Sequence, residues 1–207
     1  MMDVVEMNGI SYNLNYIEKD CWVRLLNGSL KGKDPMHNAA VASIGKFGVH
    51  QRTVVLRRVN TQQKQVAFHT DIRSGKWGEL NNGDTISWLF YDAPARIQIR
   101  LSGTITKHYN DDVANQAWNK STVNSKKVYL GLQGPSTISA IPTSGLSETL
   151  ETNTITEEEA QKGKPNFGLV ITNIQWMEWL WLNSKGHRRA AFHYNNDFTF
   201  NAHWLIP

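Results

Sequence analysis

The stretch from Arg52 to Lys76 carries residue types that could hold a flat, phosphorylated ligand. A hydrophobic run bounded by Arg52 and Arg57 leads, through a polar break and a second apolar run, to Arg73-Ser74-Gly75-Lys76. Arginine and lysine make charge-assisted hydrogen bonds to phosphate, and the first turn of a helix offers unbonded amides and a favourable dipole. The pattern therefore predicts a phosphate site at Ser74-Gly75-Lys76, with Arg52 as a cation on a neighbouring strand.

Arg52 and Arg57 would point to opposite faces of a regular strand, because side chains alternate along it. They could then contact opposite ends of an elongated ligand, or they could be two solvated charges that frame a hydrophobic strand. The fragment alone leaves both interpretations open.

The composition bounds the class of protein. With 207 residues, 40% of them hydrophobic and 19% charged, the chain can form a globular core. Its formal net charge is +4 with the basic residues spread out, which does not predict a nucleic-acid partner. The single Cys21 excludes an internal disulfide and a Cys-based metal site, and the histidines lack short metal-ligand spacing, so no metal is predicted. No apolar run suits a membrane span and no leader opens the chain, so we expect a soluble cytoplasmic protein.

The elements that must position these residues follow from apolar periodicity and turn residues. Residues 1–15 have no period and are expected to be a loosely held N-terminus. Ile17, Cys21, Trp22, Leu25 and Leu26 form one face of a helix at 17–30, which ends before Asp34-Pro35. Strands are predicted at 39–44, 51–59, 65–70, 85–91, 96–108, 167–182, 187–193 and 198–205. Helices are predicted at 74–80 with Ser74 as N-cap, at 111–120 and at 123–131, and 134–164 is expected to be a long loop with a short helix at 156–162.

The strands are joined mostly by hairpins, which favours antiparallel pairing in a closed or nearly closed barrel without exposed edges. Gly103, inside the strand at 96–108, suggests a bulge or bend there. No linker divides the chain. We therefore expect a single domain over 1–207, with 1–34 as an N-terminal extension holding one helix and 35–207 as the barrel and C-terminal strands.

Several motifs, in order, resemble the FMN-binding core of the pyridoxamine 5'-phosphate oxidase family. The similarity is greatest to the oxidase-related FMN-binding proteins that carry Thr-Asp-x-Arg-Ser-x-Lys. It rests on residues 52–57, 68–71 and 73–76, on 96–103 with the family's flavin-contacting glutamine at Gln98, and on 178–179, 187–189 and 205–207 near the C-terminus. The resemblance covers roughly residues 35 to 207.

The resemblance implies a mainly β fold with inserted helices, an FMN-binding split β-barrel that is antiparallel and Greek-key-like. It also implies a homodimer with two FMN sites at the subunit interface. Arg52 and Lys76 would bind the FMN phosphate, and Gln98 and Arg189 would contact the flavin ring. The complete set of FMN-contacting residues implied is Arg52, Thr53, Val54, Val55, Leu56, Arg57, His69, Thr70, Arg73, Ser74, Gly75, Lys76, Gln98 and Arg189.

The substrate side departs from the true oxidases. Gly145-Leu146 stands where they have a Gln-Ser pair, Leu180 replaces a tryptophan, and residues 131–134 contain no cation. His187, Ser136 and Lys185 are the remaining substrate-side candidates, and these departures disfavour oxidation of a vitamin B6 phosphate. The sequence predicts an FMN-dependent oxidoreductase acting on a small molecule, and the alternative is an FMN-binding sensor or carrier without its own turnover. No motif supports a nucleic-acid binder.

Overall fold

The computed structural model describes residues 4–7 and 9–207. The described chain divides into two compact units, and each is described by itself. The first unit extends to residue 68 and includes 83–105 and 171–207, and the second comprises 69–82 and 106–170. The single-domain organisation expected from the sequence stays a prediction.

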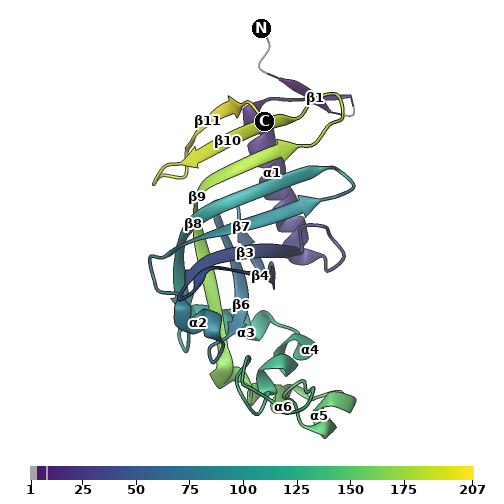
Figure 1. Ribbon diagram of the computed structural model, residues 1–207, viewed down its shortest axis with the longest axis vertical. Helices are drawn as coiled ribbons and strands as arrows, with labels where there is room; N and C mark the ends of the chain where they lie inside the picture. Colours follow the sequence, from purple (N-terminus) through teal and green to yellow (C-terminus); the bar gives the residue numbers. More distant parts are fainter. Residues whose placement is uncertain (1–3, 8) are drawn as a thin grey trace. The chain divides into compact units, whose positions relative to one another are not determined.

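The first unit is built on an antiparallel sheet in which the strand order is β11-β10-β9-β8-β7-β3-β4 (Figure 1). β6 lies off this path and pairs with β5 and β9. The mainly β fold class is confirmed, and the path has two end strands, β11 and β4, as suits a split barrel. The strands are β3 (Asn38–Gly45), β4 (Gly48–Val55), β5 (Arg58–Asn60), β6 (Gln65–Asp71), β7 (Thr85–Asp92), β8 (Ile97–His108), β9 (Phe167–Trp181), β10 (Arg188–Tyr194) and β11 (Phe200–Leu205).

One face of this sheet forms the core because its side chains alternate. In β7, Ile86, Trp88 and Phe90 are buried while the residues between them are exposed, and the Trp88 and Phe90 rings stack at 5.8 Å. Ile99 and Leu101 of β8 continue the buried face. The opposite face is referred to below as the outward face.

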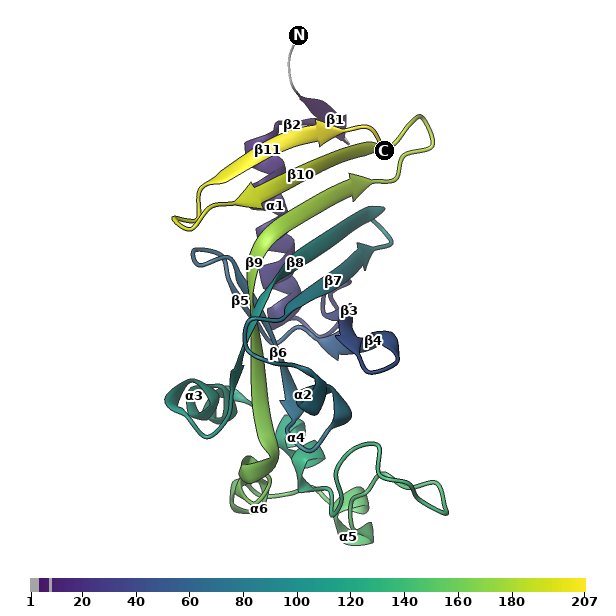
Figure 2. The same cartoon turned by 60° about the vertical axis from the view of Figure 1, so that its left-hand side comes forward.

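The helix α1 (Leu14–Leu30) lies against the core face (Figure 2). It ends at Leu30 as predicted but begins three residues earlier than predicted, because Asn13 caps it by accepting the Tyr16 amide at 2.8 Å. Ile17, Cys21, Trp22 and Leu25 are buried as predicted. Placing Leu26 on this face was wrong: it is 37% exposed, because it lies at the margin of the stripe.

The N-terminal prediction was wrong where the structure describes it. β1 (Val5–Met7) and β2 (Ile10–Tyr12) form an antiparallel hairpin in which Val5 pairs with Tyr12. Strands of three residues are too short to show a period. Residues 1–3 and 8 of that prediction lie outside the described residues.

The predicted strand at 51–59 is divided in two. β4 ends at Val55, and the chain then changes partners: the Leu56 amide donates to His37 O at 2.8 Å, and the Arg57 amide donates to Ala67 O of β6 at 2.9 Å. β5 starts only at Arg58. A change of pairing partner does not alter the alternation of apolar residues, so the sequence predicts a single strand.

The second unit contains the ends of β6, β8 and β9 and the shorter helices. Asp111 caps the predicted helix at 111–120, and Thr156 and Glu159 form a capping box on the predicted short helix at 156–162. The helix predicted at 123–131 is divided into an α and a 3-10 turn, and α5 was missed inside the predicted loop. The helices are α2 (Gly75–Glu79), α3 (Asp112–Lys120), α4 (Val123–Lys126), η1 (Lys127–Leu130), α5 (Glu148–Thr152), α6 (Glu157–Gln161) and η2 (Lys164–Asn166).

None of the helices in the described chain has the length and apolar character needed to cross a membrane. Within residues 4–7 and 9–207, no group of three or more His, Cys, Asp or Glu side chains could hold a metal ion.

Candidate functional site

Three side chains predicted to contact FMN meet in the second unit, where β6 leads into α2. Thr70 Oγ1 lies 3.2 Å from Ser74 Oγ and accepts a hydrogen bond from Lys76 Nζ at 3.2 Å. Ser74 occupies the predicted N-cap position, but its hydroxyl donates to Asp71 O at 2.7 Å and does not cap the helix. Two hydroxyls and an ammonium group therefore converge, as a phosphate or ribityl contact needs.

Arg73 is engaged within the chain. Its Nη2 donates to Asp71 Oδ2 at 2.7 Å, its Nε donates to Asp71 Oδ1 at 3.0 Å, and its Nη1 donates to Gly131 O at 2.9 Å. The hydrogen bonds that Arg73 donates to the Asp71 carboxylate raise the pKa of Arg73, so the guanidinium stays charged. Because Asp71 balances that charge, Arg73 fixes the turn before α2.

His69, Gly75 and Ser136 also lie in the second unit. The His69 ring packs edge-on against Phe167 with centroids 4.8 Å apart. A Cβ added to Gly75 would meet nothing within 4 Å, so its backbone is open to close approach. Ser136, a substrate-side candidate, is exposed in a loop with φ +72°.

In the first unit, Arg52 lies on the core side of β4. It pairs with Val41, which in turn pairs with the buried Trp88, and its Nη1 donates to Ser43 Oγ at 2.5 Å. Val54 points the same way, and Thr53 and Val55 point outward.

Leu56 and Arg57 complete the predicted run. Leu56 is fully buried and Arg57 is exposed beyond the end of β4. The alternation argument that set Arg52 and Arg57 on opposite strand faces therefore fails, because Arg57 is not in the strand.

Gln98 lies on the outward face of β8, paired with Tyr91 of β7. It borders a hollow of about 410 Å³ together with Ala40, Gln51, Leu89 and Arg100. The lining mixes apolar residues with two glutamine amides and the Arg100 guanidinium, a combination that suits an aromatic ring that carries polar edges.

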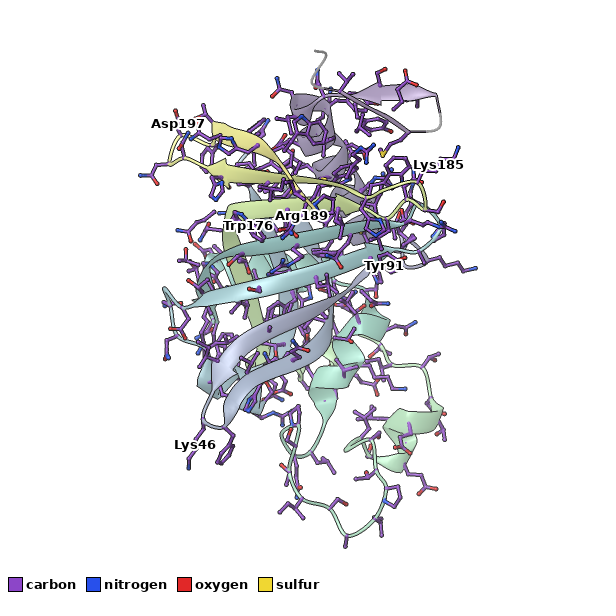
Figure 3. The ribbon with its side chains drawn as sticks, turned by 45° about the horizontal axis from the view of Figure 1, so that its top comes forward. Lys46, Tyr91, Trp176, Lys185, Arg189 and Asp197 are labelled. Atoms are coloured by element: carbon purple, nitrogen blue, oxygen red, sulfur yellow. The ribbon has the colours of Figure 1, made fainter. Side chains whose placement is uncertain are left out.

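Arg189 lies in β10 on the same outward face, where it pairs with Leu180. Its Nη2 donates to Glu178 Oε2 at 2.5 Å, and Arg100 Nη1 donates to the other oxygen, Oε1, at 3.3 Å. Arg100 also lies 5.3 Å from the ring centre of Trp176. Figure 3 shows Trp176 and Arg189 on this face.

Sequence reasoning missed Arg100, Trp176 and the role of Glu178. The available signal was spacing: Gln98 and Arg100, like Trp176 and Glu178, are two residues apart and so share a strand face. That spacing does not show which strands lie side by side.

The two C-terminal substrate-side candidates precede β10. His187 is exposed and borders a hollow of about 340 Å³ that Arg189 and Trp204 also line. Lys185 is exposed in the loop between β9 and β10, and in Figure 3 its side chain projects from that loop. The structure thus places His187 and Arg189 at the same hollow.

Residues 19–108 match the family model described as pyridoxamine 5'-phosphate oxidase, FMN-binding domain. Over these residues the chain is therefore similar to the FMN-binding domain of the pyridoxamine 5'-phosphate oxidases. The match includes Arg52, Lys76 and Gln98, and it confirms both the resemblance stated above and the cofactor, FMN. It does not extend to Arg189 or to the substrate-side candidates.

Solved structures share this FMN-binding domain fold. A pyridoxamine 5'-phosphate oxidase-related, FMN-binding protein from Nostoc punctiforme is 19% identical, with a TM-score of 0.72 over 91% of this chain and 97% of that one. PhzG from Burkholderia lata, solved with tetrahydrophenazine-1-carboxylic acid, is 18% identical, with a TM-score of 0.66 over 93% and 92%. A general stress FMN/FAD binding protein from Xanthomonas citri is 12% identical, with a TM-score of 0.52 over 82% and 91%. No curated protein matches the sequence significantly.

The donors present in each unit fit FMN. In the second unit, the Lys76 ammonium, which lies beside the Thr70 and Ser74 hydroxyls, suits the phosphate and ribityl groups. In the first unit, Arg189 Nε is buried without a hydrogen-bond partner in the described chain, and it is a donor available to a ring acceptor.

Proposed function

We propose that the protein is an FMN-dependent oxidoreductase that acts on a small-molecule substrate. The observation that carries the proposal is the FMN-binding domain match over 19–108, which contains Arg52, Lys76 and Gln98. In the proposal, Arg52, Ser74 and Lys76 bind the phosphate, and Gln98 and Arg189 hydrogen-bond the ring. When bound, FMN supplies the hydride chemistry, and the protein supplies position and electrostatics.

The residues of the outward face would favour the reduced cofactor. Arg100 and Arg189 carry two positive charges against the single negative charge of Glu178. A net positive charge beside the pyrimidine side of the ring stabilises negative charge there. These arginines would therefore help the protein to accept electrons from a substrate.

We also propose that the protein acts as a homodimer in which two copies complete each FMN site. The pairing Arg52–Val41–Trp88 puts Arg52 on the core side of the sheet, whereas Gln98 lies on the outward face with Tyr91. Because cross-strand partners share a face, the two side chains leave opposite sides of one sheet. Both side chains could contact the same FMN if one copy supplied Arg52 and the other copy supplied Gln98.

A mixing experiment tests the dimer. Arg52→Ala and Arg189→Ala are each expected to bind FMN poorly alone. If one copy supplies Arg52 and the other supplies Arg189, unfolding and refolding the two variants together yields hybrids with one intact site each, and about a quarter of all sites recover, from random pairing in a C2 dimer. Recovery of no sites, or a monomer by sedimentation, would contradict the shared site.

The phosphate role of Arg52 has a direct test. Replacing Arg52 with alanine removes a charged hydrogen bond, so FMN affinity is expected to fall by roughly 1.5–3 kcal/mol. Fluorescence quenching on titrating FMN into the apoprotein measures this change. Arg58→Ala is the control, because Arg58 is an exposed arginine of β5 outside the proposed contacts, and its FMN affinity should stay unchanged. An unaltered affinity in Arg52→Ala would argue against phosphate binding.

The substrate is best sought by its ability to bleach the flavin without oxygen. The screen should contain pyridoxine and pyridoxamine 5'-phosphates, and partly reduced aromatic carboxylic acids such as the ligand bound to PhzG. A yellow protein that a compound bleaches, and that oxygen restores, is the expected result. A colourless protein that takes up no FMN would overturn the proposal.

An FMN-binding protein without turnover is the second candidate. Residues 131–134 contain no cation to clamp a substrate phosphate, and the nearby Arg73 already pairs with Asp71 and the Gly131 carbonyl. A yellow protein that no compound in the screen bleaches would favour this candidate.

A further inference from the structure

Glu178 is a buried carboxylate on the outward face, held between two arginines of neighbouring strands. Its residue exposure is 3%, and its two oxygens accept from Arg189 at 2.5 Å and from Arg100 at 3.3 Å. The arginine side chains are 31% and 47% exposed. The acid therefore lies beneath the two arginine side chains, which are partly exposed on this face.

This arrangement fixes the direction of Arg189. A buried carboxylate is tolerated when it is paired and hydrogen-bonded, and Glu178 meets that condition with one partner on β8 and one on β10. Trp176 supports Arg100 through its ring at 5.3 Å. Removing Glu178 would leave two like charges beside each other and no group to orient them.

The pairing leaves one donor without a protein acceptor. Arg189 uses Nη2 for Glu178, and its Nε is a buried side-chain atom with no hydrogen-bond partner in the part of the chain described. Native proteins rarely leave such donors unsatisfied, and an exception calls for a ligand or other partner. Arg189 borders the hollow of about 340 Å³, so a ligand can come near it.

We propose that Glu178 is a positioning residue of the FMN site. It does not touch FMN, but it holds Arg189 so that Nε donates to an acceptor on the flavin ring, and it keeps Arg100 beside Arg189. The proposal rests on the proposed FMN site and adds the residue that orients its ring-binding cation.

A double-mutant cycle tests the proposal through the dissociation constant of FMN. Glu178→Gln keeps the size of the side chain but loses its charge, and FMN binding is expected to weaken roughly tenfold or more, the worth of a charged hydrogen bond. If Glu178 acts through Arg189, adding Glu178→Gln to Arg189→Gln changes the FMN affinity less than twofold further. Additive effects would overturn the proposal, since independent sites add.

Glu18→Gln is the matched control, because Glu18 is also a buried glutamate of the first unit, ion-paired with Lys64 at 2.7 Å on the core side. Its folded fraction should bind FMN within twofold of the unmodified protein. An equal loss of FMN affinity in this control would assign the Glu178 effect to stability and overturn the proposal. If Glu178→Gln does not fold, Arg189→Lys decides: lysine keeps the charge but lacks Nε, and unchanged affinity would overturn the assignment.

These outcomes distinguish a failure of the proposed function from a failure of the role of Glu178. An unmodified protein that binds no FMN overturns both the proposed function and the role of Glu178. An unmodified protein that binds FMN, with Glu178→Gln unchanged, overturns only the role of Glu178.

Discussion

Replacing Gly103 with alanine is expected to prevent the first unit from folding stably. A Cβ at this position would lie 1.9 Å from Asn173 O, 2.7 Å from Asn173 C and 2.9 Å from Ile174 Cα, all backbone atoms of β9. Gly103 also pairs in register with Ile86 of β7. β8 cannot retreat from β9 without losing that pairing, so a loss of more than about 4 kcal/mol is expected, as for severe overpacking.

Glycine at position 103 thus allows β8 and β9 to approach each other closely. Of the predicted bulge or bend, a bulge is not seen toward β7, since Ile86–Gly103 and Ser87–Ser102 continue one register. Denaturant unfolding followed by circular dichroism measures the effect. Gly32→Ala is the control, because its Cβ would meet nothing within 4 Å, and its unfolding free energy should change by no more than about 0.5 kcal/mol. A Gly103→Ala protein with native stability would refute the close approach.

Replacing Glu18 with glutamine is expected to cost about 3–5 kcal/mol of stability, the usual effect of breaking a buried ion pair. Glu18 Oε1 accepts from Lys64 Nζ at 2.7 Å and from the Tyr194 hydroxyl at 2.9 Å, and Trp22 Nε1 donates to the Tyr194 oxygen at 2.8 Å. Lys64 further lies over the rings of Trp22 and Tyr194, at 5.2 and 5.3 Å. The substitution would leave the Lys64 charge uncompensated.

This cluster joins α1 to the strand end at Tyr194 and to the residue before β6. Burial raises the pKa of Tyr194 well above its ordinary value, and the charge of Glu18 raises it further, so its hydroxyl stays a donor at working pH. Thermal and denaturant unfolding measure the loss. Adding Lys64→Met to Glu18→Gln removes the stranded cation and should regain part of the lost stability; no recovery would show that the charge pair is not what Glu18 contributes.

The sequence by itself determined the longer elements and the cofactor chemistry. The strand at 85–91 was predicted because its apolar residues alternate, and the helix at 17–30 because Ile17, Cys21 and Leu25 recur at helical spacing. These are local periods, set by which face each side chain occupies. The motif from Arg52 to Lys76 likewise predicts FMN binding from the types and order of its residues, and the family match over 19–108 agrees with that prediction.

Only the tertiary structure decided which residues meet. The break after Val55 arises because the amides of Leu56 and Arg57 bond to different segments, and the need for Gly103 arises from β9, about seventy residues later in the chain. The residues Arg100, Glu178 and Arg189 come from three neighbouring strands and meet only in the folded sheet. Likewise, only the sheet register shows that Arg52 and Gln98 lie on opposite faces. Strand pairing is determined by packing and backbone hydrogen bonds between segments far apart in the sequence, so the local period of apolar residues does not predict it.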